Sequence, residues 1–223
     1  MSDEEIEESN SALKEFRRTN LELFQLILLY DDKLRKTPDI IIEPRQYVEL
    51  GISGFLEKVL IDLMVIRLYR LYEIHPILGK VLNERAEEIR NLLKILSDVW
   101  NQIKSYRKKI KLWRNNRVAH SNDQAKKYVP IHIIDEDYKN TIKDILLCSR
   151  LAFWYYYVIY CNAKDLFDVA DSIYETRYGK SDYIYSHQMW RDIDKDEETV
   201  ISEINEKLQK GGFMTVPKPK FQT

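Results

Sequence analysis

Apolar residues recur at spacings of three and four along most of the chain, which is the period of an amphipathic helix. The first stretch predicts a helix from about Ser9 to Lys36, on the apolar positions Leu13, Phe16, Leu23, Phe24 and Ile27. The second predicts a helix with Pro44 in its first turn that ends at His75–Pro76, on the apolar positions Val48, Ile52, Phe55, Val59, Leu63 and Ile66. Proline is tolerated in the first turn of a helix but interrupts its interior, so the two prolines bound this element.

A third stretch predicts an unusually long helix. Asn83 is a suitable N-cap, and the apolar positions that follow it are Ile89, Leu92, Leu93, Leu96, Val99 and Ile103. The pattern leads without interruption to His120, which gives a helix of more than about 30 residues, well beyond the average for globular domains. Such a helix needs a long bundle or a partner to cover it, and we therefore expect a homodimer.

A fourth helix is predicted from Asp135 or Asp137, either of which can cap it, to about Ile173. Its apolar positions are Tyr138, Ile142, Ile145, Phe153, Tyr156 and Tyr160. A shorter helix is predicted near the end of the chain, from about Asp196 to Gly211–Gly212, because glycine commonly follows the last turn of a helix.

Together these patterns predict an all-α fold, an elongated antiparallel bundle of about four long helices plus a shorter C-terminal helix. The low glycine and proline content, six residues of each, agrees with long uninterrupted helices. The β-branched run in residues 128–134 is too short to define a sheet. We divide the chain into a helical bundle over residues 1–175 and an aromatic-rich C-terminal extension over residues 176–223 that packs on it.

Composition and short sequence signals indicate the cellular compartment that we expect for this protein. The chain has 223 residues and a formal net charge of −1, which is ordinary for a globular domain. Cys148 and Cys161 lie on one predicted helix, too far apart to bridge each other, so we expect a reducing cytoplasm. The first turn is acidic and does not resemble a secretion signal. The uncharged run between Arg150 and Lys164 is too short to span a membrane, and we expect no membrane partner.

Positive charge is concentrated in one segment of this nearly neutral chain. Its members are Lys104, Arg107, Lys108, Lys109, Lys111, Arg114 and Arg117, and no acidic residue occurs between Asp98 and Asp123. A helix face that only keeps a protein in solution usually alternates signs, as residues 84–90 do. The apolar positions Ile103, Tyr106, Ile110 and Trp113 bury the opposite face. The segment therefore predicts a phosphate-binding surface.

The residues from Leu112 to Ser121 resemble the signature of the HEPN superfamily, and look most like its abortive-infection branch. In that signature an arginine and a polar residue precede a histidine by a few positions, as Arg114 and Asn115 precede His120 here. The tyrosine that some members carry two positions after the histidine is not matched, since Asn122 stands there.

The resemblance implies a helical bundle that dimerises and brings two Arg/His pairs together to cut RNA without a metal. His120 titrates near neutrality and would move protons, while Arg114 would stabilise the charge that grows on the phosphorus. The expected RNA-binding residues are Lys108, Lys111, Asn115, Asn116, Arg117 and Ser121. A toxin of abortive infection or of a toxin–antitoxin pair is the implied setting, with a cognate antitoxin as a possible protein partner.

Other chemistries lack their sequence signals. The chain contains no glycine-rich phosphate loop, no His-Glu-x-x-His pattern and no paired-cysteine metal spacing, so we predict no cofactor and no metal. The histidines His75, His132 and His187 are interpreted as structural. The alternative function is a non-catalytic helical module that holds RNA or an acidic protein through residues 104–117.

Overall fold

The computed structural model describes residues 3–35, 46–83, 87–115, 136–163, 167 and 188–218. All regular secondary structure within these ranges is helical, and the prediction of an all-α fold is confirmed. The helices are α1 (Asp3–Arg35), α2 (Gln46–Asn83), α3 (Glu87–Ser105), α4 (Arg107–Trp113), α5 (Glu136–Asn162) and α6 (Gln188–Lys210).

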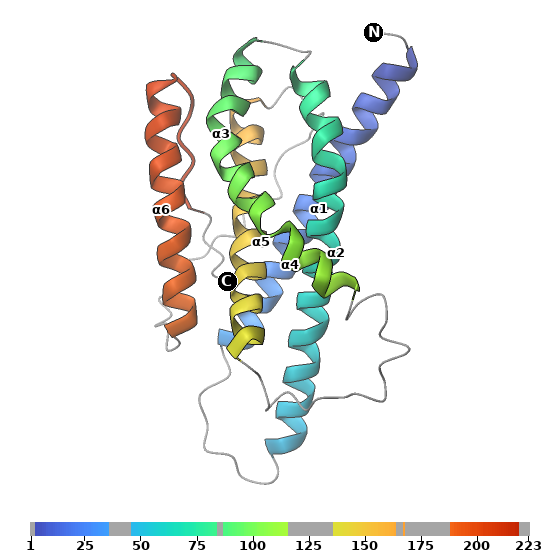
Figure 1. Cartoon of the computed structure of the whole chain (residues 1–223), viewed down its shortest axis with the longest axis vertical. Helices are drawn as coiled ribbons and strands as arrows, with labels where there is room; N and C mark the ends of the chain where they lie inside the picture. The colour runs from blue at the N-terminus through green and yellow to red at the C-terminus, as the bar shows by residue number, and fades with distance from the viewer. Residues whose placement is uncertain are drawn as a thin grey trace.

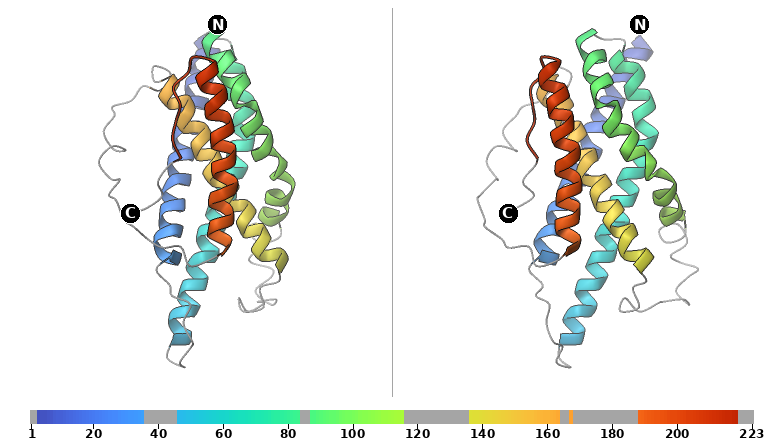
Figure 2. Two further views of the ribbon diagram at one scale, coloured as in Figure 1. Left: turned by 90° about the vertical axis from the view of Figure 1, so that its left-hand side faces the viewer. Right: turned by 60° about the vertical axis from the view of Figure 1, so that its left-hand side comes forward.

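The long helices lie side by side, and the molecule is elongated along their common direction (Figure 1). The colour gradient shows that α1, α2, α3 and α5 alternate in direction along the chain, whereas α6 runs in the same direction as α5. The central helix is α5, which contacts α1, α2, α3 and α6. It is accordingly buried almost all round between Ile145 and Tyr156. The first turns of α2 project beyond the neighbouring helices in each view (Figure 2).

The second helix differs from its prediction at its C-terminal end. Pro76 does not end α2, which continues to Asn83. Proline inside a helix removes one backbone hydrogen bond and costs ~3 kcal/mol or more. Leu78 and Leu82 lie beyond it and are buried, each contributing ~1.5–3 kcal/mol, so packing outweighs the break. Asn83 is consequently the last residue of α2 and not the N-cap of the next helix, which begins at Glu87.

The third helix is also interrupted where the sequence predicted continuity. A turn at Tyr106 separates α3 from α4, and the amide of Tyr106 donates to the carbonyl of Ile103 at 3.3 Å. That same carbonyl accepts a hydrogen bond from the buried hydroxyl of Tyr72 at 2.8 Å. A side chain that inserts into the backbone ladder is a recognised cause of a helix break. The contact comes from α2, so the local sequence of the third helix does not predict it.

The two C-terminal predictions differ from the structure in length. The fourth helix ends at Asn162, before the predicted Ile173, and α6 begins at Gln188, before the predicted Asp196. The helix of the C-terminal extension therefore has 23 residues, longer than α3 with 19 but shorter than α1, α2 and α5. It packs along α3 and α5. The proposed division at residue 175, and the β-branched run at 128–134, lie outside the described residues.

Candidate nucleic-acid interface

Two buried side chains hold the short helix α4 against the rest of the protein. Ile110 and Trp113 are 1% and 7% exposed, respectively. The indole N–H of Trp113 donates to Oδ1 of Asp62 on α2 at 2.8 Å. A buried indole N–H without an acceptor would cost ~1–3 kcal/mol, so Asp62 fixes how the end of α4 meets α2. The predicted burial of this face is correct.

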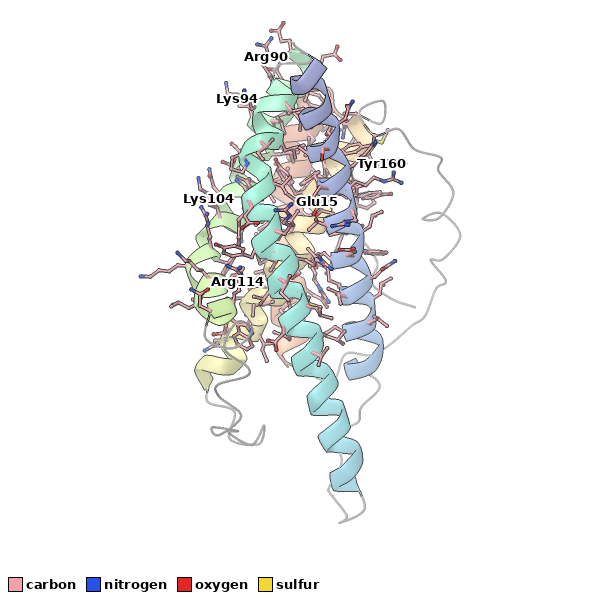
Figure 3. The ribbon with its side chains drawn as sticks, turned by 90° about the vertical axis from the view of Figure 1, so that its right-hand side faces the viewer. Glu15, Arg90, Lys94, Lys104, Arg114 and Tyr160 are labelled. Atoms are coloured by element: carbon pink, nitrogen blue, oxygen red, sulfur yellow. The ribbon has the colours of Figure 1, made fainter. Side chains whose placement is uncertain are left out.

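Cationic side chains cover the outer face of α4 and the end of α3. The exposed members are Lys104, Arg107, Lys108, Lys109 and Lys111. Figure 3 labels Lys104 and Arg114, which lie along one edge of the molecule. Among the described residues neither Lys108 nor Lys111 forms an ion pair, whereas Lys109 pairs with Asp144 on α5. The segment itself contains no acid, but α5 supplies one for Lys109.

Arg114 lies at the C-terminal end of α4 and is half-buried. Its guanidinium carbon is 4.0 Å from the ring centroid of Tyr69 on α2, a cation–π contact. A planar guanidinium stacked on a ring has less rotamer freedom to lose when it binds an anion. Tyr69 thus orients the arginine predicted to be catalytic. Asn115 follows it and is also half-buried.

Arg107, at the start of α4, lies over a second ring of α2. Its guanidinium carbon is 5.8 Å from the ring centroid of Tyr72. Burial raises the pKa of the Tyr72 phenol, with a smaller contribution from nearby Cys148, so this hydroxyl stays protonated and donates to the Ile103 carbonyl. Two rings spaced three residues apart on α2, Tyr69 and Tyr72, therefore support the two arginines at opposite ends of α4.

The predicted site residues fall into two groups. The first group lies on α4 or directly after it, and consists of Lys108, Lys111, Arg114 and Asn115. The second group lies outside the described residues, and consists of Asn116, Arg117, His120 and Ser121. Sequence reasoning missed the residues that position or neutralise α4, which are Asp62, Tyr69 and Asp144. All three belong to other helices, and no local pattern links them to α4.

His75 occupies a packed aromatic environment. Its ring stacks on Trp100 with centroids 3.4 Å apart, and Nε2 is 2.9 Å from the hydroxyl of Tyr155. Burial, with a smaller effect from Lys104, lowers the pKa of His75 to about 3. The imidazole is therefore neutral at physiological pH. These contacts agree with its structural interpretation.

The part of the chain that the structure describes contains neither a metal-binding cluster nor a membrane-spanning helix. No three His, Cys, Asp or Glu side chains in that part of the chain gather closely enough to hold a metal ion. None of the described helices has the length and apolar character needed to cross a membrane. Comparison of the chain with protein-family models, with curated proteins and with solved structures finds no match.

Proposed function

We propose that this protein is a metal-independent endoribonuclease of the HEPN type that binds RNA through the cationic face of α3 and α4. The observation that carries the proposal is the arrangement of α4, where Lys108 and Lys111 stand exposed without ion pairs to described residues and Arg114 stacks on Tyr69. Exposed cations that contact a phosphate backbone release the counter-ions condensed on the nucleic acid. This release favours binding of nucleic acid over binding of a neutral ligand.

The proposed reaction uses the substrate's own nucleophile. The ribose 2′-hydroxyl attacks the adjacent phosphorus as a base removes its proton, and the P–O5′ bond breaks as an acid protonates the departing oxygen. The products are a 2′,3′-cyclic phosphate and a 5′-hydroxyl. His120 takes one of the two proton-transfer roles, and His120 of a second copy takes the other. Arg114 holds the charge that develops on the phosphorane oxygens.

A homodimer completes this proposal because one chain supplies one Arg114/His120 pair. Leu112 on α4 is 52% exposed beside the cations, and a two-fold contact at this face would cover it. By the resemblance to the abortive-infection branch, we propose a defence role in the cytoplasm, with a cognate antitoxin as the protein partner.

The deciding experiment is incubation of the purified protein with defined RNA in chelator, followed by analysis of the product ends. The wild type should leave cyclic phosphate or 3′-phosphate ends. His120→Ala should lower cleavage by ~10²–10⁴-fold and leave RNA affinity nearly intact, because a largely neutral imidazole contributes little to phosphate binding. Arg114→Ala should impair turnover more than binding.

A matched pair of lysines tests the binding surface separately. Lys111→Ala should weaken RNA binding and reduce the slope of log affinity against log salt by about 1, as expected for one lost phosphate contact. Lys109→Ala should have a smaller effect, because Asp144 already neutralises that ammonium. Equal effects of the two variants would contradict the assigned surface. Binding without cleavage by the wild type would replace the enzyme with the non-catalytic RNA-binding module.

A further inference from the structure

The chain reverses direction after α6 and returns along it. The amide of Gly211 donates to the carbonyl of Lys207 at 3.0 Å, and the amide of Phe213 donates to the carbonyl of Leu208 at 2.9 Å. Gly212 lies between them with φ 77°, a left-handed conformation that suits glycine. Residues 213–218, which we call the C-terminal segment, then run back beside α6 (Figure 2). They lie over the seam between α5 and α6, since both helices supply their hydrogen-bond partners.

Two asparagine side chains bind the backbone of this segment at alternate residues. Asn162 of α5 accepts from the amide of Met214 at 2.7 Å and donates to its carbonyl at 3.1 Å. Asn205 of α6 accepts from the amide of Val216 and donates to its carbonyl, both at 2.9 Å. The indole of Trp154 adds a bond to the same Val216 carbonyl at 3.1 Å. This spacing of two suits an extended peptide, whose alternate residues face the same way.

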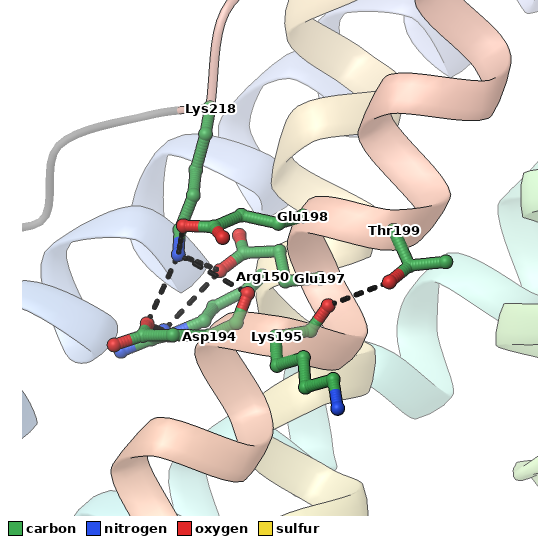
Figure 4. Close-up of polar contacts among 7 residues, drawn as sticks. All are labelled: Arg150, Asp194, Lys195, Glu197, Glu198, Thr199 and Lys218. Atoms are coloured by element: carbon green, nitrogen blue, oxygen red, sulfur yellow. Dashed lines mark hydrogen bonds and ion pairs between the residues drawn. The ribbon is translucent and has the colours of Figure 1, made fainter.

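The side chains of the C-terminal segment differ in how they contact the seam. Val216 is 1% exposed and fills an apolar site, whereas Met214 is 60% exposed. The ammonium of Lys218 lies 3.1 Å from Oδ1 of Asp194 and 3.5 Å from Oε2 of Glu197 (Figure 4). The residues that the seam selects are therefore an apolar residue and, two positions later, a lysine.

The site that binds the Lys218 ammonium carries an excess of negative charge. Arg150 on α5 and Glu197 on α6 are fully buried, and Nη1 of Arg150 contacts Asp194 at 2.8 Å and Glu197 at 3.2 Å. One guanidinium faces the carboxylates of Asp194 and Glu197, which leaves one negative charge opposite the Lys218 ammonium, and the exposed Glu198 approaches that ammonium at 3.3 Å. Oε1 of Glu197 is buried without a hydrogen-bond partner among the described residues. A buried excess charge is costly, which favours a cation as the occupant.

We propose that the seam between α5 and α6 is a recognition site for an extended peptide that carries an apolar residue two positions before a lysine. The C-terminal segment is its resident ligand, and a partner protein with the same pattern displaces that segment. Charge complementarity defines the partner, because the cluster of Arg150, Asp194 and Glu197 leaves one negative charge for the incoming ammonium to neutralise. The proposal is independent of the ribonuclease activity.

The resident segment competes strongly because it is tethered. A short connection gives an effective concentration on the order of millimolar, so a free peptide at micromolar concentration will scarcely bind the wild type. The test therefore uses the full chain with Val216→Asp and Lys218→Glu, which place carboxylates in the apolar site and beside Asp194. The probe is a labelled synthetic peptide that reproduces residues 212–219, with both ends blocked, and its binding is measured by fluorescence anisotropy.

The probe should bind the double variant at least about tenfold more tightly than it binds the wild type, whose seam is occupied. Control peptides with the lysine replaced by glutamate, or with the valine replaced by aspartate, should bind the double variant at least about tenfold more weakly than the probe. Equal binding of all three peptides, or no binding by a variant that circular dichroism shows to be folded, would overturn the proposal.

The wild type provides a second measurement that does not depend on the variant's folding. The probe at roughly millimolar concentration should displace the C-terminal segment and accelerate hydrogen exchange at the amides of Met214 and Val216. The glutamate peptide should leave both exchange rates unchanged. Exchange unaffected by the probe would count against the proposal. A dimer formed by the wild type and lost in the double variant would instead make a second copy of the chain the occupant, and would overturn the separate partner.

Discussion

Replacing Arg150 by methionine should destabilise the protein more than most single substitutions. Arg150 is fully buried and its Nη1 atom contacts both Asp194 and Glu197. Methionine fills a similar volume but removes the charge and the hydrogen bonds, which leaves the buried Glu197 carboxylate with Lys218 as its remaining cation in the described cluster. Removing one partner of a buried ion pair lowers the free energy of unfolding by roughly 3–5 kcal/mol, because the other charge stays in the interior without its partner.

The magnitude should lie near the lower end of that range. Lys218 remains 3.5 Å from Glu197 and 3.1 Å from Asp194, and its side chain is 24% exposed, so it compensates part of the lost charge. We therefore expect the free energy of unfolding to fall by about 3 kcal/mol at pH 7. For a chain of this size each kcal/mol shifts Tm by roughly 2–4 °C, which gives a decrease of about 6–12 °C.

The loss should depend on pH in a defined direction. Burial raises the pKa of Glu197 above its ordinary value of 4.5, and Arg150 and Lys218 only partly oppose this effect. A group with a raised folded-state pKa favours the folded state fully below its unfolded pKa, and this contribution is lost as pH rises through the folded pKa. Removing Arg150 raises that pKa further, so Arg150→Met should be least destabilising below about pH 4.5 and most destabilising near neutrality.

Urea unfolding followed by circular dichroism at pH 4.5 and pH 7 measures this difference. Arg150→Met combined with Glu197→Gln removes the stranded charge and should recover part of the stability lost at pH 7. Arg18→Met is a surface control, since the Arg18 side chain is 63% exposed and pairs with Glu15. It should change stability by less than about 1 kcal/mol. A loss of less than about 1 kcal/mol for Arg150→Met, or the same loss at both pH values, would refute the reasoning.

Three further predictions concern other buried groups. Trp113→Phe removes the indole donor to Asp62 and should lower the free energy of unfolding by ~1–3 kcal/mol in urea titrations; an unchanged midpoint would contradict that contact. The NMR signals of His75, whose pKa burial lowers to about 3, should show no protonation above pH 4, and stability should fall by ~1.4 kcal/mol per pH unit below 6.5. Burial raises the pKa of Cys148 to about 12, so thiol reagents followed by mass spectrometry should modify Cys161 first, and equal rates would contradict this burial.

The helices that the sequence predicted best are those with one clear apolar stripe. In α1 the predicted positions Leu13, Phe16 and Ile27 are buried, and in α3 Leu96 and Val99 are buried. In such helices the polar residues leave only one face that can pack inward, so spacing alone identifies the core positions.

Among the α2 side chains that the structure describes, from residue 59 onward, the prediction chose the wrong face. Leu63, assigned to the core, is 36% exposed, whereas Ile61, Met64 and Leu68 are fully buried. Apolar residues occur all round this helix, and several registers satisfy the spacing equally well. The face is set by what packs against it, here α1, α3, α4 and α5. Tertiary contacts therefore decide a register that the sequence of α2 leaves open.

In the candidate site too, the local sequence predicted some features, whereas others depend on contacts with distant parts of the chain. A run of cations without interleaved acids is visible in the sequence, and it identified Lys108, Lys111 and Arg114. The contacts that distinguish one cation from the next are long-range, with Tyr69 beside Arg114 and Asp144 beside Lys109. Pairing across 35 residues of chain leaves no periodic signal, so a single sequence did not contain it.

Positively charged side chains occur in two different environments in this protein, buried with carboxylate partners or exposed without them, and the difference bears on function. Arg150 has no access to water and is matched by carboxylates, because an uncompensated charge costs several kcal/mol in the interior. Lys108 and Lys111 are exposed and lack ion pairs to the described residues, a state that costs little because water solvates them. Folding stability explains the matched charge but gives no reason to concentrate unmatched ones on a short helix. Binding of an anion does give such a reason, since each exposed cation adds to the affinity for a phosphate chain.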